Sequence, residues 1–342
     1  MNRALITGIS GQDGAYLAKN LLDRGYEVYG AMRRGSTSKT SRLEMLGIVD
    51  QIKYVQMEVT EFANVQTILA DVRPDLIFNL AAQSFVADSF LFPHYTSDVN
   101  YMGVINVLEA VRILNLDAKI YQASTSEMFG EVLTKPQSEL TPFNPISPYA
   151  VSKLAAHSLV VNYRKAYGMF ASSGILFNHE SELRGLEFVT RKITSWLARI
   201  KRHDYKALPL GNLDSVRDWG YAPEYVDIMV KMLEHDFADD FVIATNTEYT
   251  VREFLEFAAS ELGMDLRFEG EGIEEKAYDV KTNKLVAYIS PDYFRASDVV
   301  YLRGDNSKAK KILGWEPTIF APEIAGKMAK FDYDRLAKLG GD

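Results

Sequence analysis

The sequence predicts an α/β protein in which helices cover both faces of a parallel sheet. A short apolar run at residues 4–7 ends in a glycine-rich turn, and a segment with helical periodicity follows at once. Further apolar runs then alternate with helical segments up to about residue 177. Because parallel strands need crossover connections, which place helices on the faces of the sheet, this alternation indicates a doubly wound fold.

The periodicity also places the individual elements. Apolar runs predict strands at 4–7, 26–32, 52–59, 76–80, 119–123 and 171–176, and helical spacing predicts helices at 15–22, 65–72, 99–114 and 149–167. After residue 178 the elements become shorter, with helices predicted at 188–201, 225–235 and 251–262 and a strand at 240–244. Residues 265–303 are irregular and polar, and we expect a loop or disorder around 271–284.

Composition and charge exclude several classes of protein. The chain has 342 residues, 47% of them hydrophobic and 25% charged, as in ordinary globular proteins. A net charge of −8 without a basic tract argues against nucleic acid or an anionic membrane as partner, so placed arginines must meet any anionic ligand. The absence of cysteine excludes disulfides, thiolate metal ligands and a cysteine nucleophile. We expect a cytoplasmic protein, since no signal peptide or membrane-spanning run is found. We also expect no metal site.

The first turn carries glycines at positions 8, 11 and 14, in the stretch Thr7–Gly14. Glycine is needed where the backbone turns tightly, approaches a pyrophosphate and packs a helix on a strand, and the helix start offers free N–H groups to the phosphates. Because the glycines follow the first strand and open the first helix, they predict dinucleotide binding on a Rossmann sheet. The alternative is a purely structural turn between strand and helix.

The end of the second strand bears on the choice of cofactor. In NAD-binding proteins of this fold, an acidic residue at this position accepts a hydrogen bond from the ribose 2′-hydroxyl. Here Arg33 and Arg34 follow the strand instead. Two arginines can bind a 2′-phosphate, so we expect NADP rather than NAD. The alternative is that both arginines face solvent or a partner subunit.

The sequence further indicates two interleaved domains. We expect residues 1–177 to form an NADP-binding Rossmann domain, to which a strand and a helix near 213–245 return. Residues 178–342 are expected to form mainly a smaller C-terminal domain that binds the substrate. No glycine/serine or proline-rich linker separates the two.

Two stretches add catalytic groups. Gln122–Gly130 places hydroxyls and the carboxylate of Glu127 after a parallel strand, at the edge where doubly wound sheets bind ligands. Tyr149 and Lys153 lie four residues apart at the start of a predicted helix, and therefore on one helical face. The lysine charge favours the phenolate, which would make Tyr149 a base. Taken alone, each feature also fits a solvated helix face or an ordinary ion pair.

The chain contains, in this order, a cofactor turn, a hydroxyl pair, an acid and a Tyr–Lys pair. This order resembles that of the extended short-chain dehydrogenase/reductase superfamily. Within it the chain is similar to the GDP-mannose 4,6-dehydratase family over nearly its whole length. The matching blocks are Gln122–Glu127 (QASTSE), Ser147–Ala150 (SPYA), Gly174–Ser181 (GILFNHES), Phe188–Ile193 (FVTRKI), Leu210–Trp219 (LGNLDSVRDW) and Asp240–Ala244 (DFVIA).

The resemblance implies a mechanism and a set of ligand contacts. Thr125, Tyr149 and Lys153 would assist the oxidation of the sugar at C4, in which the nicotinamide would accept the hydride, and Glu127 would remove the C5 proton and protonate the departing C6 hydroxyl. The expected cofactor contacts are Gly8, Gly11, Gln12, Asp13, Gly14, Arg33, Arg34, Glu58, Val59, Leu80, Ala81, Ala82, Ser84, Tyr149 and Lys153. The expected substrate contacts are Ser84, Phe85, Ser126, Asn178, Val189, Lys192, Gly211, Arg217, Arg295 and Asp298.

Some positions depart from the family pattern. Phe85 stands where the family usually has histidine, and Glu182–Gly185 replaces its usual Pro-Arg-Arg-Gly. A bulkier, less polar residue at 85 leaves GDP-N-acetylglucosamine and GDP-manno-heptose open as substrates beside GDP-mannose. An epimerase or reductase is a further alternative, although neither needs Glu127. A non-catalytic scaffold on the same fold is another. The resemblance also implies a homodimer or homotetramer.

Overall fold

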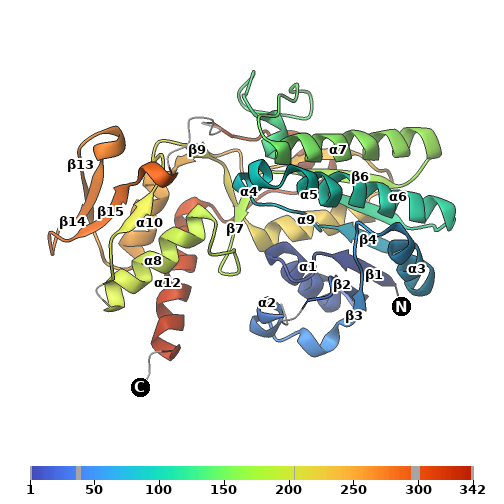
Figure 1. Cartoon of the computed structure of the whole chain (residues 1–342), viewed down its shortest axis with the longest axis horizontal. Coiled ribbons are helices and arrows are strands. Elements are labelled where there is room, and N and C mark those ends of the chain that lie inside the picture. Colours follow the sequence, from blue (N-terminus) through green and yellow to red (C-terminus); the bar gives the residue numbers. More distant parts are fainter. Residues whose placement is uncertain (1, 36–39, 204, 294–300, 340–342) are drawn as a thin grey trace. The chain divides into compact units, whose positions relative to one another are not determined.

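The computed structural model describes residues 2–35, 40–203, 205–293 and 301–339, and the chain divides into two compact units (Figure 1). The first unit comprises Met1–Phe177, Ala222–Ile243 and Asp305–Glu316. The second comprises Asn178–Tyr221, Ala244–Gly304 and Pro317–Asp342. The chain therefore leaves and re-enters each unit, and its return at Asp305–Glu316 was not expected from the sequence.

The first unit is built on one sheet of seven parallel strands, which confirms the doubly wound α/β fold (Figure 1). The strand order is β11-β6-β5-β4-β1-β2-β3. Their bounds are β1 Arg3–Thr7, β2 Glu27–Met32, β3 Lys53–Gln56, β4 Leu76–Asn79, β5 Lys119–Thr125, β6 Ala171–Leu176 and β11 Asp240–Ile243. The order reverses between β1 and β4, and such a reversal is where doubly wound sheets bind ligands.

Helices cover both faces of this sheet (Figure 1). One face carries α3 Phe62–Val72, α6 Gly103–Ile113 and α7 Pro148–Tyr167, whose valines at 65, 107 and 160 are buried with strand residues in one core. The other carries α1 Gln12–Asp23 and α9 Ala222–Glu234, which pack against each other. The remaining elements of the unit are α2 Ser41–Met45, α4 Val86–Leu91, α5 Pro93–Ser97, α11 Ser307–Leu313 and the 3₁₀ turns η1 Val49–Gln51 and η3 Ser126–Phe129.

The helix predicted at 99–114 is interrupted in the structure. Residues Asp98–Met102 (η2) form a π-helical turn, and regular α-helix begins only at Gly103. Such turns are rare and occur frequently at functional sites. Hydrophobic periodicity missed it because the turn is shaped by Asn100, a buried polar residue whose bonds to other elements are described below.

The second unit has its own sheets and core. Its four-stranded sheet has the order β13-β14-β15-β8, and two-stranded sheets join β7 with β10 and β9 with β12. The strands are β7 Asn178–Glu180, β8 Leu208–Leu210, β9 Val216–Arg217, β10 Trp219–Tyr221, β12 Tyr249–Thr250, β13 Leu266–Glu269, β14 Lys276–Asp279 and β15 Leu285–Ile289. The helices are α8 Val189–His203, α10 Val251–Glu261, α12 Ala321–Leu339 and the 3₁₀ turns η4 Gly272–Glu274 and η5 Pro291–Tyr293.

The expected loop or disorder around 271–284 is wrong. Strand β14 lies within this range and pairs with β13 on one side and β15 on the other. Ala277 on β14 and Val286, Ala287 and Ile289 on β15 are buried in the core of the unit. Strand β14 buries a single apolar residue, so its alternation is too brief to stand out in a polar sequence.

Three helices, α8, α10 and α12, pack together in the second unit, and a buried ion pair joins two of them. Arg191 on α8 lies 2.5 Å from a carboxylate oxygen of Asp332 on α12, and Thr194 donates to the other oxygen at 2.7 Å. Burial raises the pKa of Asp332, and the charge of Arg191 opposes this shift. Because breaking a buried pair leaves an unpaired charge, the contact fixes α12 on α8.

Within the described parts of the chain, none of the helices combines the length and the apolar character needed to cross a bilayer. The cytoplasmic location stays a prediction.

Candidate active site

The cofactor and catalytic residues predicted for the first unit follow its strands at one edge of the sheet. Because all seven strands are parallel, their carboxyl ends lie at the same edge. The glycine turn follows β1, Arg33 and Arg34 follow β2, and Glu58 and Val59 come after β3. Leu80–Ser84 follows β4, and Ser126 and Glu127 follow β5, which ends at Thr125.

The glycine turn is a close approach of backbone to backbone. Gly8 has φ +72°, and a Cβ there would lie 3.1 Å from the backbone of Leu80 and Ala81. A Cβ on Gly14 would lie 2.4 Å from the carbonyl oxygen of Gly8, so α1 begins directly against the turn. A side chain at Gly8 would be strained by the positive φ and the close backbone, and one at Gly14 would clash, so glycine keeps the open backbone that a phosphate cradle requires.

A chain of hydrogen bonds crosses the sheet from this turn to α7. Thr7 donates from its Oγ1 to Asn79 at 2.7 Å, and the Asn79 amide donates to Gln122 at 2.8 Å. Gln122 and Lys153 then both donate to the carbonyl oxygen of Ala123, at 3.0 and 2.7 Å. Thr7, Asn79 and Gln122 are opposite one another in the register of β1, β4 and β5. Their bonds therefore join the last residues of β1 and β4 to the middle of β5.

Helix α7 presents the Tyr–Lys pair. Ser147 caps the helix by accepting from the amide of Ala150 at 3.1 Å, and Pro148 occupies the first helical position. Tyr149 and Lys153 follow one turn apart and are both buried, with Lys153 only 4% exposed. Burial lowers the pKa of Lys153 from 10.5 to about 8, so the side chain remains mostly protonated at neutral pH.

The hydroxyl and the acid lie where β5 ends. Thr125 caps the 3₁₀ turn η3, since its Oγ1 accepts from the backbone N–H of Glu127 at 3.2 Å. Gly130 ends the turn with φ +53°, and a Cβ there would strike the carbonyl oxygen of Asn144. The turn is therefore held at both ends. Thr125 and Ser126 are buried, whereas Glu127 is partly exposed.

His157 is a residue of this region that the sequence analysis missed. It follows Lys153 by one turn of α7, so Tyr149, Lys153 and His157 share one helix face. Its Nδ1 lies 3.1 Å from the hydroxyl of Ser124, the neighbour of Thr125 on β5, and burial lowers its pKa. The signal was available in the spacing of 149, 153 and 157, but a histidine on a helix face is normally structural.

Asn100 in the π-helical turn was missed as well. It pairs with the backbone of Gln83 in both directions, accepting from its N–H at 2.8 Å and donating to its carbonyl at 3.0 Å. It also donates to Ser152 at 3.1 Å, and Ser152 donates to the carbonyl of Tyr149 at 2.7 Å. Asn100 therefore ties the loop after β4 to the helix that carries the Tyr–Lys pair.

The arginines after β2 have further neighbours. Arg33 donates to the hydroxyl of Tyr95 on α5, and both Arg33 and Arg34 are exposed. Arg42 on α2 donates to the carbonyl oxygen of Ser10, inside the glycine turn, at 2.9 Å. Arg42 was not predicted, because it lies on a short helix thirty-two residues after the turn and no local sequence pattern links the two.

The predicted substrate contacts after residue 177 lie in the second unit. Asn178 begins β7, and its Oδ1 is buried without a hydrogen-bond partner in the protein. Lys192 donates to the carbonyl of Pro209 at 2.7 Å and lies over the ring of Tyr293, and burial lowers its pKa to about 8. Position 211 requires glycine for a packing reason as well, since a Cβ there would lie 2.4 Å from the carbonyl oxygen of Tyr293.

Four further predicted contacts complete the set. Val189 begins α8, and Arg217 ends β9 with its guanidinium donating to the carbonyl of Val216 at 2.9 Å. Arg295 and Asp298 lie outside the described residues. The structure therefore brings Lys192 and Gly211 to the same turn around Tyr293, and places Arg217 two positions before the residue that pairs with Asn178.

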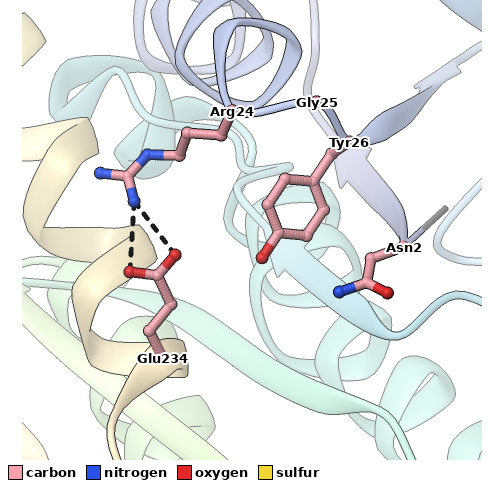
Figure 2. Close-up of a pocket in the computed structure, with 5 residues that line it drawn as sticks. All are labelled: Asn2, Arg24, Gly25, Tyr26 and Glu234. Carbon is pink, nitrogen blue, oxygen red and sulfur yellow. Dashed lines mark hydrogen bonds and ion pairs between the residues drawn. The ribbon is translucent and has the colours of Figure 1, made fainter.

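A polar surface pocket of about 330 Å³ lies elsewhere in the first unit (Figure 2). Its lining residues Asn2 and Arg24–Tyr26 precede β1 and β2, so it is at the amino edge of the sheet. Arg24 is already paired with Glu234 at 3.0 Å (Figure 2). It is also paired with Asp227 at 2.6 Å. This pocket contains none of the predicted site residues.

His157 gives the site a predictable response to acid. Burial disfavours its protonated form, so in the folded protein its pKa is below the ordinary value near ~6.5. The unfolded chain then binds more protons as the pH falls through that value, and the stability that depends on neutral His157 is lost. We predict that the difference in free energy of unfolding between the wild type and His157→Phe shrinks between pH 7.5 and 5.5.

Denaturant unfolding at a series of pH values measures this difference. His203→Phe, at an exposed position, is the control, and its difference from the wild type should not depend on pH in this way. A difference for His157→Phe that stays constant or grows on acidification would contradict the prediction.

Solved structures with similar folds cover nearly the whole chain. DesIV, a dTDP-glucose 4,6-dehydratase from Streptomyces venezuelae with NAD and TYD bound, matches with a TM-score of 0.82 and 19% identity, covering 98% of each chain. RMD from Pseudomonas aeruginosa, complexed with NADPH, matches with a TM-score of 0.76 and 21% identity, covering 98% of this chain and 100% of the other. At this level of identity the likeness concerns the fold.

Sequence comparison identifies the family. A GDP-mannose 4,6-dehydratase from Vibrio cholerae is 49% identical over 96% of this chain and 93% of its own length. The Homo sapiens GDP-mannose 4,6 dehydratase is 44% identical over 98% of this chain and 92% of its own length. The family model described as GDP-mannose 4,6 dehydratase matches residues 5–328. With the Tyr–Lys pair on α7 and the Thr-Ser-Glu turn after β5 in place, the chain belongs to the GDP-mannose 4,6-dehydratase family.

Proposed function

We propose that this protein is an NADP-dependent GDP-sugar 4,6-dehydratase, which converts GDP-mannose to GDP-4-keto-6-deoxymannose by removing water. The observation that carries the proposal is the arrangement on β5 and α7. Lys153 is buried one turn from Tyr149 and is bonded to Ala123, two residues before Thr125, and Glu127 follows in the capped turn. Family membership supports the same reaction.

The first unit has the groups to hold a nicotinamide dinucleotide. The glycine turn, closed to any side chain at Gly8 and Gly14, offers backbone N–H groups at the start of α1 to the pyrophosphate. Arg33 and Arg34 would meet a 2′-phosphate, which is the reason for naming NADP. When bound, such a cofactor would supply a hydride acceptor that is restored within the same cycle, since the hydride removed from sugar C4 is returned to C6, so the reaction would have no net redox change.

The residues of α7 and β5 would handle the proton of the sugar O4. Tyr149 as phenolate accepts this proton, and Thr125 donates a hydrogen bond to the same oxygen. Lys153, protonated and fixed on the carbonyl of Ala123, stabilises the phenolate by its charge. The resulting 4-ketone makes the neighbouring C5–H acidic, which prepares the elimination.

Glu127 would carry out the elimination itself. As carboxylate it removes the C5 proton, and as carboxylic acid it then gives a proton to the C6 hydroxyl, which leaves as water. One carboxyl group can serve both steps because the first leaves it protonated for the second. The proton that Tyr149 took from O4 would then go to C5 as hydride returns to C6, so both residues end the cycle in their starting states. Its place in a turn capped by Thr125 and closed at Gly130 fixes the backbone from which it acts.

The second unit would bind the GDP part of the substrate. Lys192 and Arg217 provide cations for the pyrophosphate, and the unpartnered Oδ1 of Asn178 is an acceptor for a ligand hydroxyl or N–H group. Val189, Gly211, Arg295 and Asp298 complete the proposed contacts there. In the first unit, Ser84, Phe85 and Ser126 are proposed to contact the sugar.

Phe85 favours a second candidate substrate within the same reaction. It is the N-cap of α4, half-buried, and its carbonyl accepts from Gln83 at 2.9 Å. An aromatic side chain here, close in sequence to Ser84, favours a larger or less polar sugar than mannose. GDP-N-acetylglucosamine and a GDP-manno-heptose are therefore tested beside GDP-mannose.

The activity can be tested by incubating the purified protein and NADP with each of the three GDP-sugars. We predict loss of water from GDP-mannose, or from one of the other two sugars, by mass spectrometry. Glu127→Gln should abolish both this loss and the uptake of solvent deuterium at C5, and Tyr149→Phe should lower turnover by about 10²–10⁴-fold.

Exposed Glu131 provides a matched control, and Glu131→Gln should retain full activity. Absence of dehydration with all three sugars would contradict the proposed function. Full turnover by Glu127→Gln would contradict only the role of that residue.

Cofactor choice can be tested by titrating NADP and NAD. We predict that Arg33→Ala combined with Arg34→Ala weakens NADP binding at least about tenfold and changes NAD binding little, since only NADP carries the 2′-phosphate. Arg24→Ala, an arginine before β2 at the opposite edge, should leave both affinities unchanged. Equal weakening of both cofactors would contradict the role in 2′-phosphate binding.

We also propose a homodimer, or a homotetramer built from two dimers. Large apolar side chains are exposed on α4, the residue after it and α5, which pack against α7, and α7 adds Val151. They are Phe90, Leu91, Phe92 and Tyr95. Light scattering should give a dimer or larger species for the wild type and a monomer for Leu91→Asp. A monomeric wild type at micromolar concentration would refute this.

A further inference from the structure

Asp218 is a buried acid that the proposed chemistry does not use. It is the single residue between β9 and β10, and it is fully inaccessible to solvent. One of its oxygens accepts from the backbone N–H of Thr245 at 2.7 Å and from its hydroxyl at 2.6 Å. The other accepts from the backbone N–H of Asn246 at 2.9 Å and of Gly304 at 3.2 Å.

These four bonds join three segments that are distant in sequence. Asn246 has a positive φ of 58°, so the turn at 245–247 has an unusual conformation that the carboxylate stabilises. Gly304 ends a segment that already runs along β9, where Tyr301 forms a bridge with Val216 and Leu302 donates to the Val216 carbonyl at 3.2 Å. The side chain of Asp218 thus extends the contacts between β9 and residues 301–304 that begin at Val216.

Two proposed ligand contacts depend on these segments. Arg217 precedes Asp218 directly, and its guanidinium donates to the same Val216 carbonyl that holds Leu302. On the other side, Trp219 is paired with Asn178 in β10 and β7. The segment at 301–304 follows, within a few residues, the stretch that contains Arg295.

The electrostatics of Asp218 distinguish it from an ordinary core residue. Burial raises its pKa to about 6, while the four donors oppose the shift, so the carboxylate is ionised at neutral pH. Its bonds come from N–H and O–H groups, and a hydrogen bond to a charged group is stronger and more directional than a neutral one. An ionised carboxylate at this place keeps all three segments at fixed distances.

We infer that Asp218 is a positioning residue for sugar-nucleotide binding, which sets the strand of Arg217 against the turn at 245–247 and the segment that ends at Gly304. The inference rests on the proposed function, because it takes Arg217 as a contact of the GDP pyrophosphate. Asp218 itself does not touch the ligand. Its effect is on affinity, through the place of the arginine, and it leaves the chemical step on β5 and α7 unchanged.

The test is Asp218→Asn in the full-length protein, compared with Asp214→Asn. The amide group presents an N–H where the carboxylate accepted N–H groups, so one side of the junction loses its bonds. We expect the Kd for GDP and the KM for the GDP-sugar to rise at least about tenfold, the kcat to change less than about threefold, and the Kd for NADP to stay the same. Asp214, exposed and four residues upstream, should show none of these changes when replaced by Asn.

Thr245→Val is a second variant, in which the carboxylate keeps its three backbone donors. We expect it to raise the Kd for GDP by a smaller factor, and this result decides the matter if Asp218→Asn does not fold. A Kd for GDP within about twofold of the wild type in the folded variants, even with a lower melting temperature, would overturn the inference. If the wild type neither binds GDP nor dehydrates a GDP-sugar, the proposed function has failed instead.

Discussion

The hydrogen-bond chain from Thr7 to Lys153 is the interaction on which the first unit depends. It runs through Asn79 and Gln122 across β1, β4 and β5, and ends where Lys153 meets the carbonyl of Ala123. Each of these polar groups is buried, and a buried polar group is tolerated only when it is bonded. These hydrogen bonds satisfy the buried polar groups of the core. They therefore also fix the glycine turn, strand β5 and the Tyr–Lys helix relative to one another.

Burial also determines the charge state of the groups around α7. Burial lowers the pKa of Lys153 to about 8, and it also lowers the pKa of His157, one turn further along the helix. A lysine that stays protonated although burial disfavours its charge gains stability from a neighbouring anion, so it is well suited to stabilise a phenolate. The second unit uses burial in a comparable way, because Asp218 and the Arg191–Asp332 pair hold its segments together with charges that are almost fully enclosed.

Much of the first unit could be predicted because its signals are local. The glycines of the first turn, the apolar runs of the strands, and the Tyr149–Lys153 spacing each depend on residues close together in the chain, and strand and helix periodicity require only short windows. The Thr-Ser-Glu motif after β5 was readable for the same reason. In contrast, a loop or disorder was expected around 271–284, where the structure has β14, since this strand buries a single apolar residue and shows no clear period.

The amino-acid sequence by itself determined the fold class and the family, and it supplied the candidate residues for the proposed chemistry. Only the tertiary structure revealed which distant residues support them: His157 against Ser124, Asn100 against Gln83, Arg42 against Ser10, and Asp218 against Thr245, Asn246 and Gly304. The physical reason is that these contacts are buried or partly buried hydrogen bonds between residues up to 86 positions apart. Such bonds leave no periodic pattern, because each requires only one polar residue at a place that the packing of the whole unit selects.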